Sequence, residues 1–191
     1  MLEYTGGFWE TPDLDNPDPL IIFEASGRKH YEKLLQEREI SARATAKMLG
    51  VDFPVLQEHP DVFSVFIFLH EFGHIHDFIK NYVDTSPDVI RAVEKNRGVR
   101  NMEMNSLPIP GRNPVDVRQM ADGGELERYL QTYWFYFEGK GIASPDALIK
   151  AHEEAYRNLP SEVHADRFAA TVLQKHWVDV GFDAYGGFAV S

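Results

Sequence analysis

Apolar residues recur at helical spacing along much of the chain. Between residues 28 and 49 they return every three or four positions, and Gly50 is placed to end a helix there. A strongly apolar segment then begins at Pro60-Asp61, a typical helix start, and continues to about Tyr82. Capping, glycine and proline signals predict further helices over residues 87–97, 125–138, 145–158 and 160–177.

One short segment has the character of a strand. Residues 20–23 are apolar and are flanked by Pro19 and Gly27, which suits a buried strand. Residues 1–19 are rich in proline, aspartate and glycine and are expected to be irregular, and prolines at 107–114 predict a loop. The expected fold class is therefore α+β, predominantly helical with a small β element.

Length and composition restrict the class of protein. With 191 residues, 43% of them hydrophobic, the chain is expected to form a single domain, 1–191. The net charge of −11 disfavours binding to nucleic acids or to anionic membranes. Cysteine is absent, and no signal peptide or bilayer-spanning apolar run is visible. These features predict a cytoplasmic protein.

Residues 69–78, LHEFGHIHDF, place three histidines and a glutamate within an apolar segment. Unpaired polar groups are costly in such surroundings, and a metal ion would compensate several of them. His70 and His74 lie one helical turn apart, so both imidazoles can bind one Zn²⁺. Glu71 is rotated by about 100° from His70, so it flanks the ion and can take a proton from a zinc-bound water. This is the HExxH pattern of metallopeptidases, and Gly73 allows a close approach beside the second ligand.

Catalytic zinc usually has three protein ligands, so a third ligand is needed. The extended pattern HExxHxxGxxH fails here, because Asp77 and Lys80 occupy the glycine and histidine positions, and the cysteine ligand of peptide deformylases is also missing. In SEVHADRFAA, residues 161–170, Glu162 and Asp166 lie one helical turn apart. Glu162 is the predicted third ligand, and Asp166 is expected to accept a hydrogen bond from a ligand imidazole. The small Ala165 and Ala169 would let the two helices pack closely.

An HExxH motif followed by E-x-x-A-D-x-F-A resembles the gluzincin-type zinc metallopeptidases, most closely the ImmA/IrrE family. The resemblance implies a zincin-like core, with His70, His74 and Glu162 as zinc ligands, Glu71 as the base and Asp166 orienting a ligand. Proteins of that family are soluble intracellular peptidases that cleave repressor-type regulators. A protein or peptide substrate of that kind is therefore implied.

The spacing between the two motifs differs from that of the ImmA/IrrE family. From His74 to Glu162 is 88 positions, which is longer than is usual there. The membrane-bound Ste24/HtpX-like peptidases have longer gaps and a similar second segment, but their transmembrane helices have no counterpart in this sequence. Residues 83–158 are therefore predicted to be an insertion or a substrate-covering subdomain.

Other polar and aromatic residues have separate predicted roles. His76 is expected to be a hydrogen-bonded or surface histidine, since it points to another side of the helix from His74. Asp183, in GFDAYGG, is an alternative third ligand. The aromatic run 133–137 is expected to form core or cleft wall, and some of its rings could contact a partner. The candidate donors to a transition-state oxyanion are Tyr156, His164, Arg167, His152 and Tyr185.

Two functions remain open on this evidence. The leading one is a zinc-dependent endopeptidase that hydrolyses peptide bonds of a protein substrate with a metal-bound water activated by Glu71. The alternative is a non-catalytic module, in which zinc stabilises the fold and a partner protein is bound or regulated. The complete HExxH motif favours the enzyme, because a structural site has no need of Glu71 and usually has four protein ligands.

Overall fold

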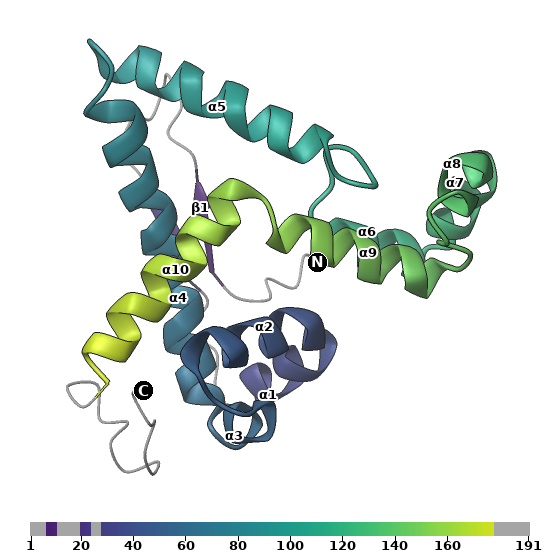
Figure 1. Cartoon of the computed structure of the whole chain (residues 1–191), viewed down its shortest axis with the longest axis horizontal. Helices are drawn as coiled ribbons and strands as arrows, with labels where there is room; N and C mark the ends of the chain where they lie inside the picture. The colour runs from purple at the N-terminus through teal and green to yellow at the C-terminus, as the bar shows by residue number, and fades with distance from the viewer. Residues whose placement is uncertain (1–6, 11–19, 24–27, 178–191) are drawn as a thin grey trace. The chain divides into compact units, whose positions relative to one another are not determined.

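The structure is a computed structural model that describes residues 7–10, 20–23 and 28–177. These residues are predominantly helical, as predicted, with one two-stranded antiparallel sheet (Figure 1). In chain order the elements are β1 (Gly7–Glu10), β2 (Leu20–Phe23), α1 (Arg28–Glu37), α2 (Glu39–Leu49), α3 (Phe53–Glu58), α4 (Pro60–Phe78), the π-helix η1 (Ile79–Val83), α5 (Val89–Asn105), α6 (Pro114–Asp122), α7 (Glu125–Thr132), α8 (Trp134–Glu138), α9 (Pro145–Arg157) and α10 (Pro160–Lys175). The chain divides into two compact units, a first unit of residues 1–97 and 161–191 and a second unit of residues 98–160.

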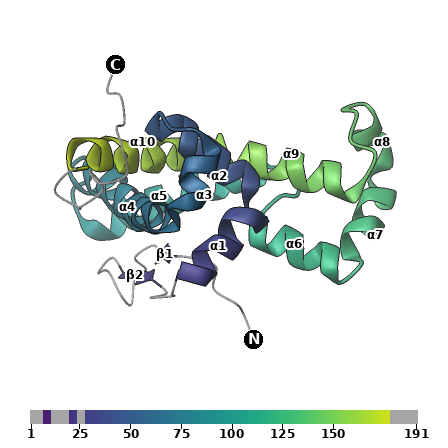
Figure 2. The same ribbon diagram turned by 90° about the horizontal axis from the view of Figure 1, so that it is seen from below.

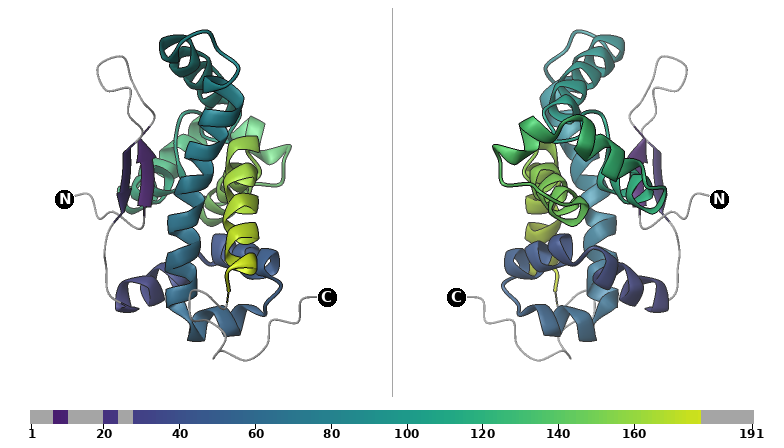
Figure 3. Two further views of the ribbon diagram at one scale, coloured as in Figure 1. Left: turned by 90° about the vertical axis from the view of Figure 1, so that its left-hand side faces the viewer. Right: turned by 90° about the vertical axis from the view of Figure 1, so that its right-hand side faces the viewer.

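The first unit is built on α4 and α10, which lie side by side (Figure 3, blue and yellow). Helix α2 packs against α1 and α3, all three helices pack against α4, and β1 also contacts α4. Their shared core is apolar and includes Leu34, Leu35, Leu56, Phe63, Phe66, Ala169 and Leu173. Several sides of α4 are therefore covered, and Val62, Phe63, Phe66 and Phe78 are buried, whereas Phe68 and Phe72 are 39% and 41% exposed.

The long helix predicted over residues 28–49 is interrupted in the structure. Arg38 has φ −115° and ψ 44°, which ends α1 and separates it from α2. Gly50 ends α2 as predicted, with φ 76° in the left-handed region that glycine adopts without strain. β2 coincides with the predicted strand, whereas β1 lies in a segment predicted to be irregular.

The helix predicted from Pro60 to about Tyr82 is confirmed, with its last turn in the π conformation. The span Pro60–Val83 is long and apolar enough to cross a membrane by length and composition. The central helix of a soluble protein meets the same criterion, and α4 buries Phe63, Phe66 and Phe78 inside the first unit. This property alone therefore does not indicate a membrane segment.

α5 is longer than the predicted helix over residues 87–97. It begins after Asp88, whose carboxylate accepts a hydrogen bond from the N–H of Arg91 at 2.9 Å, and it continues through Gly98 to Asn105. An aspartate in this position satisfies an N–H that has no partner within the helix. The second unit begins within α5, and the prediction that residues 83–158 are an insertion in a single domain stays a prediction.

The second unit consists of the end of α5 and helices α6 to α9, with α6 and α9 side by side (Figure 2). α9 starts as predicted, since the Ser144 hydroxyl accepts a hydrogen bond from the N–H of Ala147 at 3.2 Å. α6 was not predicted, although Asn113 caps it in the same way, accepting from the N–H of Asp116 at 2.9 Å. The shared core of this unit is Ile109, Val117, Leu126, Phe137 and Leu148.

The predicted helix over residues 125–138 is broken at Tyr133, which has φ −110° and ψ 23°. The prediction that the aromatic run forms core or cleft wall is correct only for Phe137, because residues 133–136 are exposed. Consecutive residues on a helix point to different sides, so one of the five rings faces the core while its neighbours cannot.

A buried histidine joins a loop of the second unit to α9. His152 is fully buried, its Nδ1 accepts a hydrogen bond from the N–H of Ile109 at 3.3 Å, and its Nε2–H donates to the carbonyl of Arg112 at 3.0 Å. Burial lowers the pKa of His152, because the charged imidazolium loses solvation. Both ring nitrogens are therefore used by the fold, and His152 is not available as an oxyanion donor.

Candidate metal centre

The site depends on an unusually close approach of α4 and α10. A Cβ atom built on Gly73 would lie 2.6 Å from the Cα and 2.9 Å from the carbonyl oxygen of Ala165. Real Cβ atoms essentially never come closer than 3.0 Å to another heavy atom, so only glycine fits at this crossing. Ala165 and Ala169 are fully buried on the facing side of α10, which confirms that small residues allow the contact.

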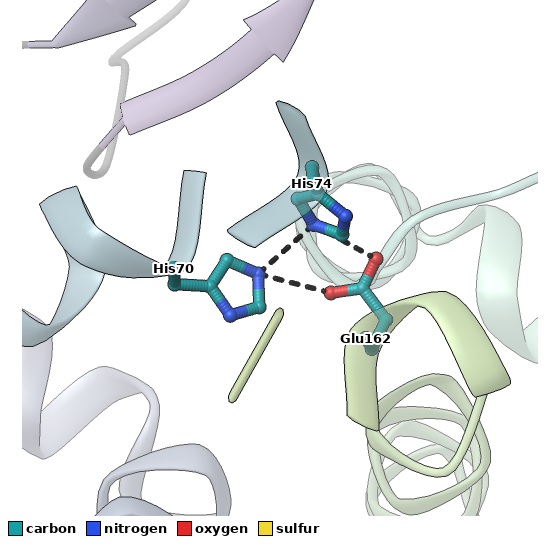
Figure 4. Close-up of side chains that lie close together, drawn as sticks. All are labelled: His70, His74 and Glu162. Carbon is teal, nitrogen blue, oxygen red and sulfur yellow. Dashed lines mark hydrogen bonds and ion pairs between the residues drawn. The ribbon is translucent and has the colours of Figure 1, made fainter. Parts of the chain in front are cut away.

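Three side chains converge where the helices cross (Figure 4). The Nε2 atoms of His70 and His74 are 3.1 Å apart. The carboxylate of Glu162 places one oxygen 3.3 Å from His70 Nε2 and the other 3.6 Å from His74 Nε2. The side chains are 11%, 7% and 3% exposed in the order His70, His74 and Glu162. The structure therefore brings together the two histidines and the carboxylate that the sequence predicted.

The dimensions of this group suit one small cation. Bonds of about 2.0–2.1 Å in a tetrahedral arrangement separate neighbouring ligand atoms by about 3.3–3.4 Å. The two Nε2 atoms are 3.1 Å apart and one Glu162 oxygen is 3.3 Å from His70 Nε2, both close to that value, while the 3.6 Å distance from His74 Nε2 is to the other oxygen of the same carboxylate. The two imidazole planes are perpendicular, with ring centres 4.7 Å apart, and His70, His74 and Glu162 each offer one ligand atom within 4.8 Å of the others. Among the described residues this is the one group of three or more such side chains that could hold a metal ion.

Asp166 fixes the orientation of one ligand. Its carboxylate accepts a hydrogen bond from Nδ1–H of His70 at 2.8 Å, one turn beyond Glu162 on α10. A proton on Nδ1 leaves the lone pair of the neutral ring on Nε2, the atom that faces His74 and Glu162. The role predicted for Asp166 from its spacing thus agrees with the contact that it makes.

The charge distribution of the site favours a cation. Burial alone would lower the pKa of His70, but the hydrogen bonds to Asp166 and Glu162, together with the charges of these carboxylates, raise it from 6.5 to about 9. Without a metal ion, His70 is therefore protonated at neutral pH. A divalent ion bound to Nε2 would replace that proton beside the same two carboxylates.

Glu71 is buried next to the group and is not one of its three converging ligands. It follows His70 directly on α4, so its side chain leaves the helix about 100° away from the ligand face. A carboxylate placed in this way is separate from the ligand set, as the HExxH pattern requires.

His76, Asp77 and His164 form a different cluster along the edge of the same helix pair. His76 is exposed, and its Nδ1 lies 3.3 Å from Nε2 of His164, with the two rings within 11° of parallel. His164 Nδ1 is 3.7 Å from a carboxylate oxygen of Asp77. The prediction that His76 is hydrogen-bonded at the surface is confirmed. Its pairing with His164 had no signal in the sequence, since 88 positions separate them.

Two of the remaining donor candidates, Tyr156 and Arg167, lie within the described residues. Arg167 is exposed on α10, and Tyr156 belongs to the second unit. Tyr185 and the alternative ligand Asp183 lie outside the described residues. The roles of Tyr156, His164 and Arg167 as oxyanion donors stay predictions.

Comparison with models of protein families, with curated proteins and with solved structures finds no match for this chain. The geometry of His70, His74, Glu162 and Asp166 is therefore the main indication of what this protein does.

Proposed function

We propose that this protein is a zinc-dependent endopeptidase of the gluzincin type, with a zincin-like core formed by α4 and α10. The observation that supports it best is the convergence of His70, His74 and Glu162, with Asp166 orienting the first of them. Motif spacing alone suggested this set, and the distances of the site are consistent with it. The chain would act on a protein or peptide in the cytoplasm, and a repressor-type regulator is the substrate that the family resemblance suggests.

Zinc is the metal that this ligand set suits. Two neutral imidazoles and one carboxylate are typical zinc ligands, whereas calcium and magnesium prefer oxygen ligands alone. Structural zinc sites close their coordination with four protein side chains, often cysteines. This group has three, which would leave one position for a water or a substrate, as in catalytic sites.

Glu71 would provide the acid–base chemistry. A bound zinc ion supplies Lewis acidity, which polarises a peptide carbonyl and lowers the pKa of a water molecule. The Glu71 carboxylate accepts the proton that the attacking water loses, and then delivers it to the nitrogen of the leaving amine. Asp166 keeps the imidazole of His70 in one tautomer throughout, so that the site does not reorganise between binding and reaction.

The experiment compares the wild-type protein with Glu71→Gln. Both proteins are freed of metal, loaded with one equivalent of zinc, and incubated with a mixture of synthetic peptides and unfolded casein, with mass spectrometric detection of products. We expect cleavage by the wild type, loss of cleavage with a chelator and its return with zinc. Glu71→Gln should bind zinc equally well and cleave at least about 100-fold more slowly, because the general base is lost.

A matched control is Glu94→Gln, which removes an exposed carboxylate from α5 and should cleave as the wild type does. Intact peptides in every sample, despite one zinc per chain, would contradict the peptidase and favour the non-catalytic zinc-stabilised module. Full activity of Glu71→Gln would contradict the assignment of the base.

A further inference from the structure

A second pair of histidines joins α4 to α10, apart from the group of three converging ligands. Nδ1 of His76 lies 3.3 Å from Nε2 of His164. His76 is exposed, and the side chain of His164 is 33% exposed, so both rings can be reached from solvent. The general-base mechanism proposed above makes no use of this pair.

The pair lies at the opposite edge of the helix crossing from the candidate metal centre. With a rotation of about 100° per residue, the two predicted histidine ligands lie about 60° and 100° to one side of Gly73, and His76 lies about 60° to the other. On α10 the predicted carboxylate ligand likewise lies to one side of Ala165 and His164 to the other. The close contact of Gly73 with Ala165 separates the two edges. The pair is therefore a feature of its own, with no ligand in common with the centre.

The separation of the two nitrogens suits one metal ion. Bonds of about 2.0–2.1 Å in a tetrahedral arrangement separate two ligand atoms by about 3.3–3.4 Å. The observed separation between His76 and His164 is 3.3 Å. As a hydrogen bond this distance is long, so little interaction is lost when an ion takes the place of the shared proton.

Neighbouring side chains hold both rings in place for such an ion. Nδ1 of His164 lies 3.7 Å from a carboxylate oxygen of Asp77, whose charge favours a proton on Nδ1 and leaves the lone pair on Nε2, toward His76. Asp77 in turn accepts a hydrogen bond from the amide of Asn81 at 2.6 Å. The ring of Phe168 lies against His76, with ring centres 5.1 Å apart. Ligands that are already positioned lose less entropy when they bind.

The arrangement repeats that of the candidate metal centre. There, too, a carboxylate lies beside Nδ1 of one histidine, and Nε2 of that histidine faces a second imidazole on the other side of a short gap. The difference is the third ligand, because no further carboxylate or histidine of the described residues completes a group of three at this edge.

We propose that His76 and His164 form a second, weaker binding site for a divalent transition-metal ion, which fastens α4 to α10. Imidazole nitrogens suit Zn²⁺, Ni²⁺ and Cu²⁺, whereas magnesium and calcium prefer oxygen ligands. Water completes the coordination, since both side chains are accessible. An ion that binds only the folded protein stabilises it increasingly as the metal concentration rises. Zinc beyond the first equivalent thus stabilises the helix pair that carries the candidate centre.

The test is a calorimetric titration of the metal-free full chain with Zn²⁺. We expect the wild type to bind two equivalents, the second at least about 100-fold more weakly than the first, because it has two protein ligands instead of three. His76→Ala and His164→Ala should each bind a single equivalent. The matched control, His176→Ala, removes another exposed histidine of the first unit and should still bind two.

Thermal unfolding gives a second readout that does not depend on catalysis. Between one and twenty equivalents of zinc, the unfolding temperature of the wild type should continue to rise, and that of His76→Ala should not. Without metal the two proteins should unfold at similar temperatures, because His76 is exposed. Asp77→Asn should weaken the second equivalent about tenfold and leave the first unchanged.

Three results would overturn the proposal. One is a single equivalent in the wild type even at millimolar zinc. Another is a second equivalent that persists in both His76→Ala and His164→Ala, which would place the ion on other surface groups. The last is an equal weakening of both equivalents by His70→Gln, which would mean that the two sites are not separate. Failure of the peptidase assay would leave these stoichiometries unchanged, so the two proposals can fail independently.

Discussion

Replacing Gly73 by alanine perturbs the contact between α4 and α10 that brings Glu162 to the two imidazoles. The new Cβ would lie 2.6 Å from the Cα of Ala165, whereas ordinary contact begins at 3.4 Å. The neighbouring atoms belong to the backbone of a helix, so they cannot rotate away. The two helices must separate by about 0.8 Å at this point, since a packed interface has no space to absorb the atom.

Two effects on stability oppose each other in this variant. Alanine is favoured over glycine inside a helix by about 1 kcal/mol. Overpacking of a close interface typically costs about 1–3 kcal/mol, and here the overlap is with backbone atoms, which places the cost at the upper end. We expect the free energy of unfolding of the metal-free protein to fall by about 1–2 kcal/mol.

The effect on the metal site should be larger than the effect on the fold. Glu162 precedes Ala165 by one helical turn, so a displacement of α10 at Ala165 also displaces the carboxylate. Metal–ligand distances tolerate changes of only about 0.2 Å. We expect zinc affinity to fall at least about tenfold, a loss comparable to that caused by removing a group that orients a ligand.

Gly98→Ala is the matched control, because Gly98 also lies inside a helix and its added Cβ would meet nothing within 4 Å. This variant should be about 1 kcal/mol more stable than the wild type and bind zinc unchanged. Urea unfolding followed by circular dichroism gives the stability, and competition with a chromophoric chelator gives the affinity. The reasoning is refuted if Gly73→Ala and Gly98→Ala have the same stability and the same zinc affinity.

Three further predictions follow from the buried hydrogen bonds. Asp166→Asn should lower zinc affinity by about 10–100-fold in the same competition assay, because an amide holds the imidazole less firmly; unchanged affinity would contradict the role of Asp166. The metal-free protein should lose up to about 3 kcal/mol of stability as the pH rises from 6.5 through 9, since the raised pKa of His70 stabilises the fold only while the ring is protonated; His70→Gln should lack this loss. Conversely, the lowered pKa of His152 should destabilise the fold as the pH falls below 6.5, because the unfolded chain then binds the proton more readily. Urea unfolding of His152→Gln between pH 5 and 8 should show a smaller dependence, and an equal dependence would exclude His152 as the cause.

Local signals in the sequence were sufficient to predict much of the fold and the two histidines of the candidate metal site. His70 and His74 are four residues apart, so they lie on one face of a helix regardless of how the rest of the chain folds. Gly50 and Ser144 end and begin helices through their own backbone and side-chain preferences. Such features depend on neighbours within one turn, which is why spacing alone predicts them.

Features that depend on distant parts of the chain were harder to predict. The breaks at Arg38 and Tyr133 have no proline or glycine to mark them, and α5 continues through Gly98 because one glycine costs a helix only about 1 kcal/mol. Tertiary packing can outweigh preferences of that size. The pairing of His76 with His164 arises only once α4 and α10 are in contact.

The third candidate ligand, Glu162, was also hard to predict from the sequence. A glutamate with an aspartate one turn later is common on exposed helix faces, so its sequence pattern is weak. Gly73 on α4 and Ala165 on α10 are the local signs that the helices could touch, and the contact that they make brings Glu162 within 3.3 Å of His70. Glu162 therefore had only a weak signal in the sequence, and its distances to the two histidines required the fold.

The most direct test of the account is a crystal structure of the protein loaded with one equivalent of zinc, with diffraction data collected on both sides of the zinc absorption edge. We predict a single anomalous peak about 2.0–2.2 Å from His70 Nε2, His74 Nε2 and a carboxylate oxygen of Glu162. A peak elsewhere, or a peak bound by the histidines while Glu162 points into solvent, would contradict the central claim.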